Sequence, residues 1–169
     1  MSKPGPILVL SRLKAEQYTP SADAVCVSIT NPRQSPAALA GWSDLLRLGF
    51  HDTDRKGGNF VTMSLGHAGE FLRFCQRHKA HPLMVHCEAG ASRSVAAGLF
   101  AAAWMGRQLE LTATDVLAPN PWVIRMLRLA GVFYAIKWVD SNLLKVSLLG
   151  PLAFRYTVLP PAIADTYLD

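Results

Sequence analysis

The chain has 169 residues, which suits one domain with a full core. Half of the residues are hydrophobic and only 17% are charged, which excludes an intrinsically disordered chain. The net charge of +5 is compatible with an anionic substrate, but no run of Lys and Arg favours a nucleic-acid partner.

Three cysteines without framework spacing fit a reducing compartment better than a disulfide scaffold. The N-terminal residues lack the apolar core of a signal peptide, and the most apolar stretch, residues 95–105, is too short to span a bilayer. We therefore expect a cytoplasmic protein without a membrane partner. The oligomeric state is left open.

Three short apolar runs in the first third of the chain predict strands, at residues 7–10, 24–29 and 45–50. Residues 11–20 are predicted to be a connecting segment, and residues 36–43 a loop or short helical turn. Cys26 falls inside the second run, where a buried thiol is expected to be a small core residue.

A polar loop with a pair of glycines follows the third predicted strand, at residues 51–59. Loops of this kind on a rigid scaffold often carry function. Asp52 comes directly after the apolar run, and Asp54 follows two residues later. Both carboxylates are candidates for proton transfer, and the alternative is that they are solvated loop charges.

Apolar residues at helical spacing predict a helix over residues 63–79, with Ser64 placed to cap its start. Cys75 falls on the buried face of this helix. The histidines nearby do not form a zinc pattern with cysteines, so no metal site is predicted.

The most informative stretch is Leu-Met-Val-His-Cys-Glu-Ala-Gly-Ala-Ser-Arg-Ser, residues 83–94. It predicts a buried strand that ends at Cys87, a tight loop, and a helix over residues 93–105 that is apolar nearly all round. Gly106 is predicted to end this helix.

The start of that helix and the small residues before it predict an anion site. The first amides of a helix have no intrahelical partner, and the helix dipole places partial positive charge there. Arg93 adds two donors in a planar fork. All three features favour the thiolate form of Cys87, which is the nucleophilic form of a thiol. The alternative is a buried structural cysteine at a strand end.

The segment of residues 109–119 is short, and its sequence does not indicate one type of secondary structure. Asn120 and Pro121 precede a predicted helix that runs to about Val139, with proline at its first position. The apolar, proline-bearing residues 142–169 match no pattern. We predict a domain over residues 1–140 and an extension of unknown role, 141–169, that packs on it.

Strands and helices alternate along the chain, so the predicted fold is a single α/β domain with a central, mostly parallel sheet and helices on both faces. Ligands bind such sheets outside the carboxyl ends of the strands, and Cys87 is predicted to lie at one of them.

The His86-Cys87-(five residues)-Arg93-Ser94 pattern resembles the signature loop of the cysteine-dependent protein tyrosine phosphatases. The Ala-Gly-x-Ser-Arg-Ser ending is most similar to the small dual-specificity branch. The resemblance extends more loosely over about residues 45–140.

The resemblance implies a phosphomonoester hydrolase with a phosphocysteine intermediate and no cofactor or metal. Cys87 would be the nucleophile, Asp52 or alternatively Asp54 the general acid, and Ser94 the hydroxyl that stabilises the departing thiolate. His86 would orient the loop by hydrogen bonding and support the thiolate, without transferring the proton itself. The substrate phosphate would be bound by Glu88, Ala89, Gly90, Ala91, Ser92 and Arg93.

The expected substrate is a protein or peptide carrying phosphotyrosine, with phosphoserine and phosphothreonine as a second class. Glu88 inside the loop argues against a polyanionic phosphoinositide. Two alternatives remain open at this point. One is a phosphate-binding module with little turnover, and the other is a sulfurtransferase or arsenate reductase that uses the same cysteine.

Overall fold

The computed structural model describes residues 4–54, 57–112 and 117–146. Five strands form one sheet in the order β3-β2-β4-β1-β5, and every pairing is parallel. The strands are β1 (Ile7–Ser11), β2 (Val25–Thr30), β3 (Asp44–Gly49), β4 (Leu83–Cys87) and β5 (Leu109–Leu111). The predicted α/β class is confirmed.

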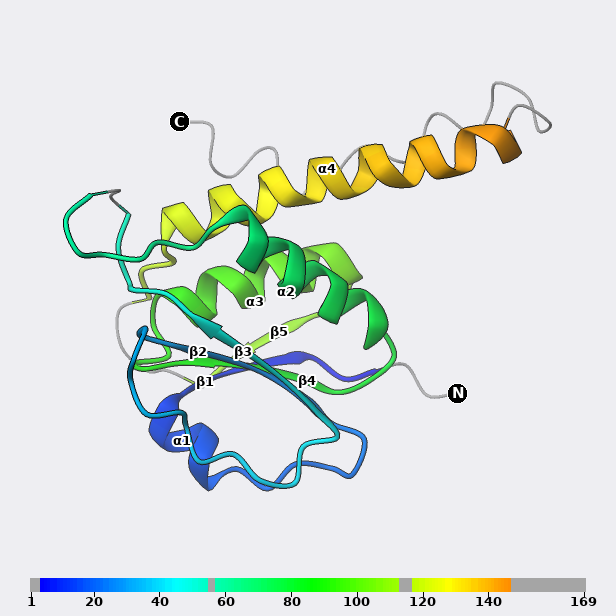
Figure 1. Cartoon of the computed structure of the whole chain (residues 1–169). Coiled ribbons are helices and arrows are strands. Elements are labelled where there is room, and N and C mark those ends of the chain that lie inside the picture. Colours follow the sequence, from blue (N-terminus) through cyan, green and yellow to red (C-terminus); the bar gives the residue numbers. More distant parts are fainter. Residues whose placement is uncertain (1–3, 55–56, 113–116, 147–169) are drawn as a thin grey trace.

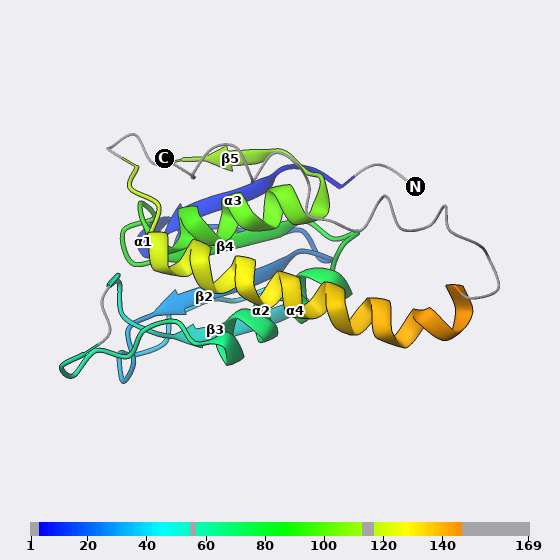
Figure 2. The same cartoon turned by 90° about the horizontal axis from the view of Figure 1, so that it is seen from above.

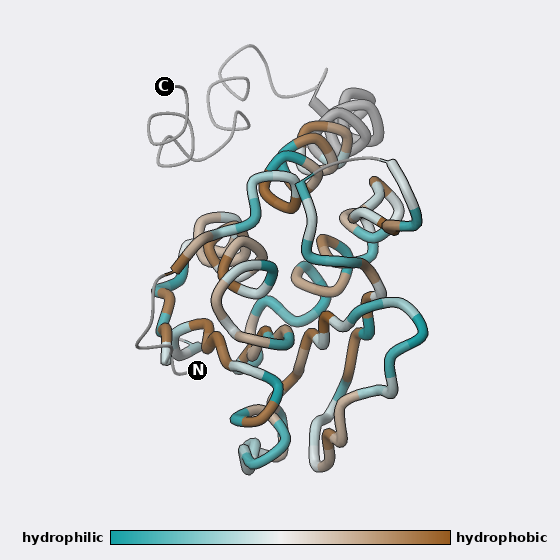
Figure 3. Tube along the Cα trace, turned by 90° about the vertical axis from the view of Figure 1, so that its left-hand side faces the viewer, coloured by the Kyte–Doolittle hydropathy of each residue, from teal (hydrophilic) through white to brown (hydrophobic). Residues whose placement is uncertain are grey.

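The helices lie on both faces of the sheet, as Figure 1 shows. One face carries the short α1 (Arg12–Gln17), and the other carries α2 (Leu65–Arg77), α3 (Arg93–Met105) and α4 (Pro121–Val146). Seen from above, α4 crosses the helical layer and extends past the rest of the domain (Figure 2). Hydrophobic segments gather along the strands in the middle of the molecule (Figure 3).

The two sides of the sheet bury separate clusters because successive side chains of a strand point to opposite faces. Val85 and Cys87 of β4 join the large core beneath α2, α3 and α4. Met84 joins a smaller cluster on the α1 face, together with Leu10 and Cys26. Cys26 and Cys75 are both buried core residues, as predicted.

Helix α3 is buried on almost every side, which explains its uniformly apolar sequence. It approaches the sheet so closely that a Cβ at Gly98 would lie 2.6 Å from Val9. The predicted caps are also observed. Ser64 accepts the amide of His67 at the start of α2, and Gly106 ends α3 in the left-handed conformation.

Three predicted segments differ from the structure. The predicted connection over residues 11–20 contains α1, whose six residues bury only Ala15 and so show no apolar periodicity. The ambiguous segment begins with β5, which is too short to show alternation. The predicted end of the last helix near Val139 is wrong, because α4 continues to Val146 and crosses the predicted boundary at residue 140. Residues 147–169 of the predicted extension lie outside the described residues.

Candidate functional site

Cys87 is the last residue of β4, the central strand of the sheet. The carboxyl ends of parallel strands meet at one edge of a sheet, so Cys87 lies where ligands of α/β proteins bind. Its side chain is buried, and its Sγ atom lies 3.0 Å from the Oγ atom of Ser94 in the first turn of α3. The hydroxyl of Ser94 is therefore in hydrogen-bonding contact with the candidate nucleophile.

The loop of residues 88–92 joins Cys87 to α3 and curls against the end of β1. Gly90 has a φ of +74°, and a Cβ there would lie 2.6 Å from the amide nitrogen of Ser11. Only glycine fits this position. The amide of Arg12 donates to the carbonyl of Glu88 at 3.1 Å, which fixes the first residue of the loop.

The N-terminus of α3 is the place where the sequence predicts an anion site. Ser92 occupies the position before the helix, but its side chain makes no capping hydrogen bond. Its hydroxyl donates instead to Asp52 at 2.8 Å. The first amides of α3 therefore have no side-chain cap from Ser92, and the helix dipole favours a negative charge there.

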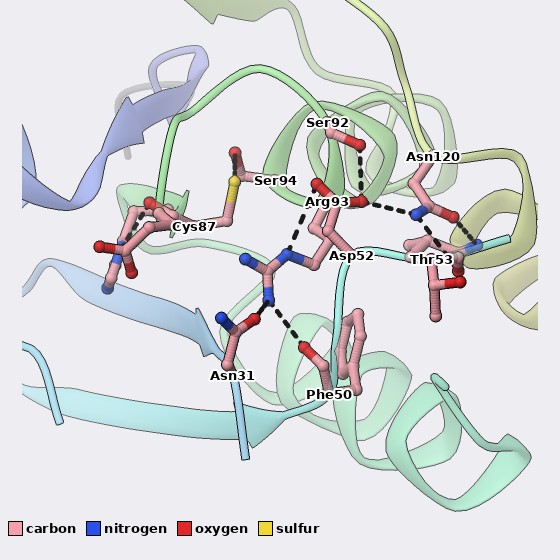
Figure 4. A network of polar contacts seen from close by, with 12 residues as sticks. Asn31, Phe50, Asp52, Thr53, Cys87, Ser92, Arg93, Ser94 and Asn120 are labelled. Atoms are coloured by element: carbon pink, nitrogen blue, oxygen red, sulfur yellow. Dashed lines mark hydrogen bonds and ion pairs between the residues drawn. The ribbon is translucent and has the colours of Figure 1, made fainter. Parts of the chain in front are cut away.

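Arg93 is 3% exposed and lies at the centre of the site (Figure 4). One terminal nitrogen, Nη1, donates to Asn31 Oδ1 at 2.9 Å and to the carbonyl of Phe50 at 2.7 Å. Its Nε atom is buried and has no hydrogen-bond partner among the described residues. A buried charged donor left unsatisfied is costly, and an oxyanion bound in the loop would satisfy it.

Asp52 enters the site from the loop that follows β3. Its Oδ1 atom accepts hydrogen bonds from Ser92 and from Asn120, and its Oδ2 atom lies 3.9 Å from Nε of Arg93. Asp54 lies two residues farther along the same loop, and both carboxylates are exposed. Asp52 contacts the 88–92 loop through Ser92 and approaches Arg93.

His51 joins the two ends of this loop through hydrogen bonds to Val61. Its backbone amide donates to the carbonyl of Val61 at 2.8 Å, and its Nδ1 atom accepts the amide of Val61 at 2.9 Å. His51 thus shapes the loop that carries Asp52.

His86 lies next to Cys87 in the sequence but on the opposite face of the sheet, the face that carries α1. Its Nδ1 atom lies 3.4 Å from the carbonyl oxygen of Cys87, and its Nε2 atom has no partner among the described residues. Burial lowers the pKa of His86, so the neutral imidazole is favoured. His86 can therefore hold the backbone at the start of the loop. Its ring and the sulfur of Cys87 lie on opposite faces of the sheet.

Two residues of the candidate site, Asn31 and Asn120, are not predicted from the sequence. Asn31 follows β2 and orients Arg93. Asn120 precedes α4 and binds Asp52. The Asn-Pro pair at residues 120–121 marks a helix start, but nothing in the sequence indicates that either amide contacts residues more than 60 positions away.

The other thiols are poor partners for Cys87. Burial raises the pKa of Cys75 to about 12 and also raises that of Cys26, so both stay protonated. Cys26 lies on the α1 face and Cys75 in α2. Within residues 4–54, 57–112 and 117–146, no group of three or more His, Cys, Asp or Glu side chains is arranged to hold a metal ion.

A cavity of about 650 Å³ lies on the α1 face and is lined by residues that include Leu10, Trp42 and Met84. None of the site residues lines it. This cavity is therefore not part of the candidate site at Cys87, which is formed by the 88–92 loop and the N-terminus of α3. None of the helices within the described residues combines the length and the hydropathy of a membrane-spanning segment.

No family model and no curated protein matches the chain at the sequence level. Solved structures do match it. The crystal structure of human DUSP28, a dual-specificity phosphatase, superposes with a TM-score of 0.51 at 21% identity, covering 80% of this chain and 99% of that one. A variant of human DUSP28, in which one tyrosine is replaced by histidine, also gives a TM-score of 0.51, at 23% identity, covering 79% of this chain and 95% of that one. The chain therefore has a fold like that of the dual-specificity phosphatases.

Proposed function

We propose that the protein is a cysteine-dependent phosphatase that hydrolyses phosphotyrosine in proteins or peptides, with phosphoserine and phosphothreonine as a second substrate class. The observation that carries the proposal is the convergence of Cys87, Arg93 and Asp52 at one end of the sheet. The sulfur lies beside the N-terminus of α3, a buried guanidinium presents an unsatisfied donor, and a carboxylate lies 3.9 Å from it.

In the first step, the thiolate of Cys87 attacks phosphorus. The S–P bond forms while the bond from phosphorus to the ester oxygen breaks. The equatorial oxygens carry negative charge through the transition state, and the loop amides together with Arg93 stabilise it. Asp52 donates its proton to the leaving oxygen, so the product departs as an alcohol or phenol.

In the second step, water attacks the phosphocysteine. Asp52, now ionised, accepts a proton from the water, and the S–P bond breaks to release inorganic phosphate. The sulfur departs as a thiolate, and the hydroxyl of Ser94, 3.0 Å away, is placed to donate a hydrogen bond to it. Both steps use only side chains and amides of this chain.

The alternatives are less well supported by the same geometry. A binding module would not need a carboxylate held beside Arg93 by two hydrogen bonds. An arsenate reductase would use a resolving thiol, and both other thiols are buried in separate parts of the core. Neither Cys26 nor Cys75 is placed for that role.

The side chain of Glu88 supports a protein substrate over a polyanionic lipid. It accepts a hydrogen bond from Gln34 at 3.0 Å and lies 3.7 Å from Arg12. It therefore adds a negative charge at the rim of the 88–92 loop and engages the cation nearest to it. A substrate with several phosphates would meet this carboxylate where it needs positive charge.

The test is hydrolysis of para-nitrophenyl phosphate and of a phosphotyrosine peptide by the wild-type protein and by Cys87→Ser. We expect turnover of both by the wild type, none by Cys87→Ser, and retained peptide binding by the variant. Wild-type protein that binds the peptide without turnover would favour the binding module. Activity on thiosulfate or arsenate without phosphate release would favour the other alternative.

A further inference from the structure

Asn120 uses both ends of its side-chain amide. It is 4% exposed and precedes α4, where its Oδ1 atom accepts the amide of Val123 at 3.1 Å and its backbone carbonyl accepts the amide of Ile124 at 3.2 Å. Asn120 is thus the N-cap of α4. The other end, Nδ2, donates to Asp52 Oδ1 at 2.7 Å (Figure 4).

The orientation of this amide is fixed by its two neighbours. Rotating it by half a turn would place an oxygen against the carboxylate of Asp52 and an NH₂ group against the amide of Val123, and both contacts would be repulsive. The backbone amide of Asn120 also lies 3.4 Å from the carbonyl of Ser92, which ties α4 to the 88–92 loop. One residue therefore links the start of α4, the loop after β3 and the 88–92 loop.

The hydrogen bonds on Asp52 determine which of its oxygens can carry a proton. Oδ1 accepts from Ser92 at 2.8 Å and from Asn120 at 2.7 Å, so both of its lone pairs are used. A proton on the carboxyl group must then sit on Oδ2. That oxygen is the one near Arg93, on the side where the phosphate oxygens would lie.

We propose that Asn120 is a positioning residue for the general acid: its Nδ2 holds Asp52 so that the proton on Oδ2 points at the leaving oxygen. This inference rests on the proposed phosphatase function. The N-cap alone does not require asparagine, because aspartate and serine cap helices equally well. Among these three, asparagine alone also offers an N–H donor to a carboxylate.

The test measures kcat/KM, which reports the first chemical step, on two esters that need the acid to different extents. Para-nitrophenolate leaves with little help from a proton, whereas phenolate from phenyl phosphate needs one. Asn120→Asp keeps an acceptor for the start of α4 and removes the donor to Asp52. We expect this variant and Asn120→Ala to lower kcat/KM on phenyl phosphate by about 10- to 100-fold, with a much smaller loss on para-nitrophenyl phosphate.

A double-mutant cycle separates this role from a structural one. In an Asp52→Asn background, Asn120→Ala should change kcat/KM by less than about 2-fold, because the group that it positions is already gone. Ser64→Ala is the matched control, since it removes the N-cap of α2 without touching Asp52. It should lower Tm and leave the ratio of the two esters unchanged.

The outcomes distinguish the two proposals. Hydrolysis that survives Cys87→Ser, or no hydrolysis by the wild type, would overturn the proposed function and the role of Asn120 with it. Two results would overturn the role of Asn120 alone, provided that hydrolysis depends on Cys87. One is an equal loss of kcat/KM on both esters in the Asn120 variants. The other is a loss of kcat/KM from Asn120→Ala that is as large in the Asp52→Asn background as in the wild type.

Discussion

At the scale of single residues, the site depends on which oxygen, nitrogen or sulfur atom meets which partner. Cys87 and Ser94 meet at 3.0 Å. Arg93 donates to Asn31 and to the carbonyl of Phe50, and its Nε atom has no hydrogen-bond partner among the described residues. Asp52 joins this group from a position 35 residues before Cys87 in the sequence. These contacts set the expected effects of single substitutions.

Asp52→Asn is expected to lower kcat/KM on phenyl phosphate by roughly 10²–10⁴, the usual scale for loss of a general acid. Asp54→Asn is the matched control, because it makes the same change two residues farther along the loop. Steady-state kinetics on both variants decides between them. A small effect of Asp52→Asn with a large effect of Asp54→Asn would reassign the acid.

Ser94→Ala is expected to slow breakdown of the phosphocysteine by roughly 10- to 150-fold, the worth of one hydrogen bond to a charged group. The first turnover should stay fast, so rapid-mixing kinetics should show a burst of para-nitrophenolate followed by a slow phase. Ser28→Ala is the control, since that hydroxyl is also buried but makes no hydrogen bond among the described residues. A burst in both variants, or in neither, would contradict the role of Ser94.

At the scale of elements, the 88–92 loop is held by its fit against β1 as much as by its own sequence. The carbonyl of Glu88 is bonded to the amide of Arg12, and Gly90 lies against the backbone of Leu10 and Ser11. The backbone of β1 therefore restricts the conformation of the loop. This makes the loop sensitive to a single added methyl group.

Gly90→Ala is expected to destabilise the protein by roughly 2–5 kcal/mol. About 1–2 kcal/mol comes from the left-handed conformation and about 1–3 kcal/mol from overpacking against β1. Gly106→Ala separates the two terms, because Gly106 also has a positive φ but a Cβ there would meet nothing within 4 Å. Urea unfolding midpoints measure both variants. Equal losses in the two variants would show that the contact with β1 contributes nothing.

At the scale of the whole molecule, the sheet separates the candidate site at Cys87 from a second buried polar group, the imidazole of His86. The imidazole of His86 is 0% exposed, on the face opposite to the sulfur of Cys87. Burial is the main reason why its pKa lies below the ordinary value of 6.5. The folded protein thus keeps this histidine neutral where the unfolded chain would protonate it.

The stability of the protein is therefore expected to fall as the pH drops below about 6.5. The unfolded state binds a proton there that the folded state does not, so the contribution of neutral His86 is complete above pH 6.5 and is lost as the pH falls toward its lowered pKa. The slope from this group is at most ~1.4 kcal/mol per pH unit. His86→Leu should remove it.

Urea unfolding of the wild type and of His86→Leu at about pH 7.5 and about pH 5.5 measures this difference. His81→Gln is the control, because His81 is only partly buried and its ring Nδ1 donates a hydrogen bond to the carbonyl of Asp23 at 3.0 Å. An identical loss of stability in the wild type and His86→Leu would show that His86 does not titrate on unfolding.

The elements that can be predicted from the amino-acid sequence are those whose signals are local. A buried strand, a loop of small residues and an apolar helix follow one another at residues 83–105, and the reason is that backbone amides, helix dipole and side-chain spacing are all set by neighbours in the chain. The α/β class followed from the alternation of such segments. Short elements such as α1 and β5 were missed because they have too few residues to show a period.

The identity of the distant residues that complete the candidate site follows from the folded chain and not from local sequence. Asp52 contacts Ser92 and approaches Arg93. Asn31 binds Arg93, and Asn120 binds Asp52. The hydrogen-bonded partners are 40 to 68 residues apart in the sequence. The tertiary structure also decided that His86, next to Cys87 in the chain, lies on the other face. Each result has its own physical cause. Parallel strands bring their carboxyl ends to one edge of the sheet, which gathers the distant residues, and the pleat of β4 sends the neighbouring side chains of His86 and Cys87 to opposite faces.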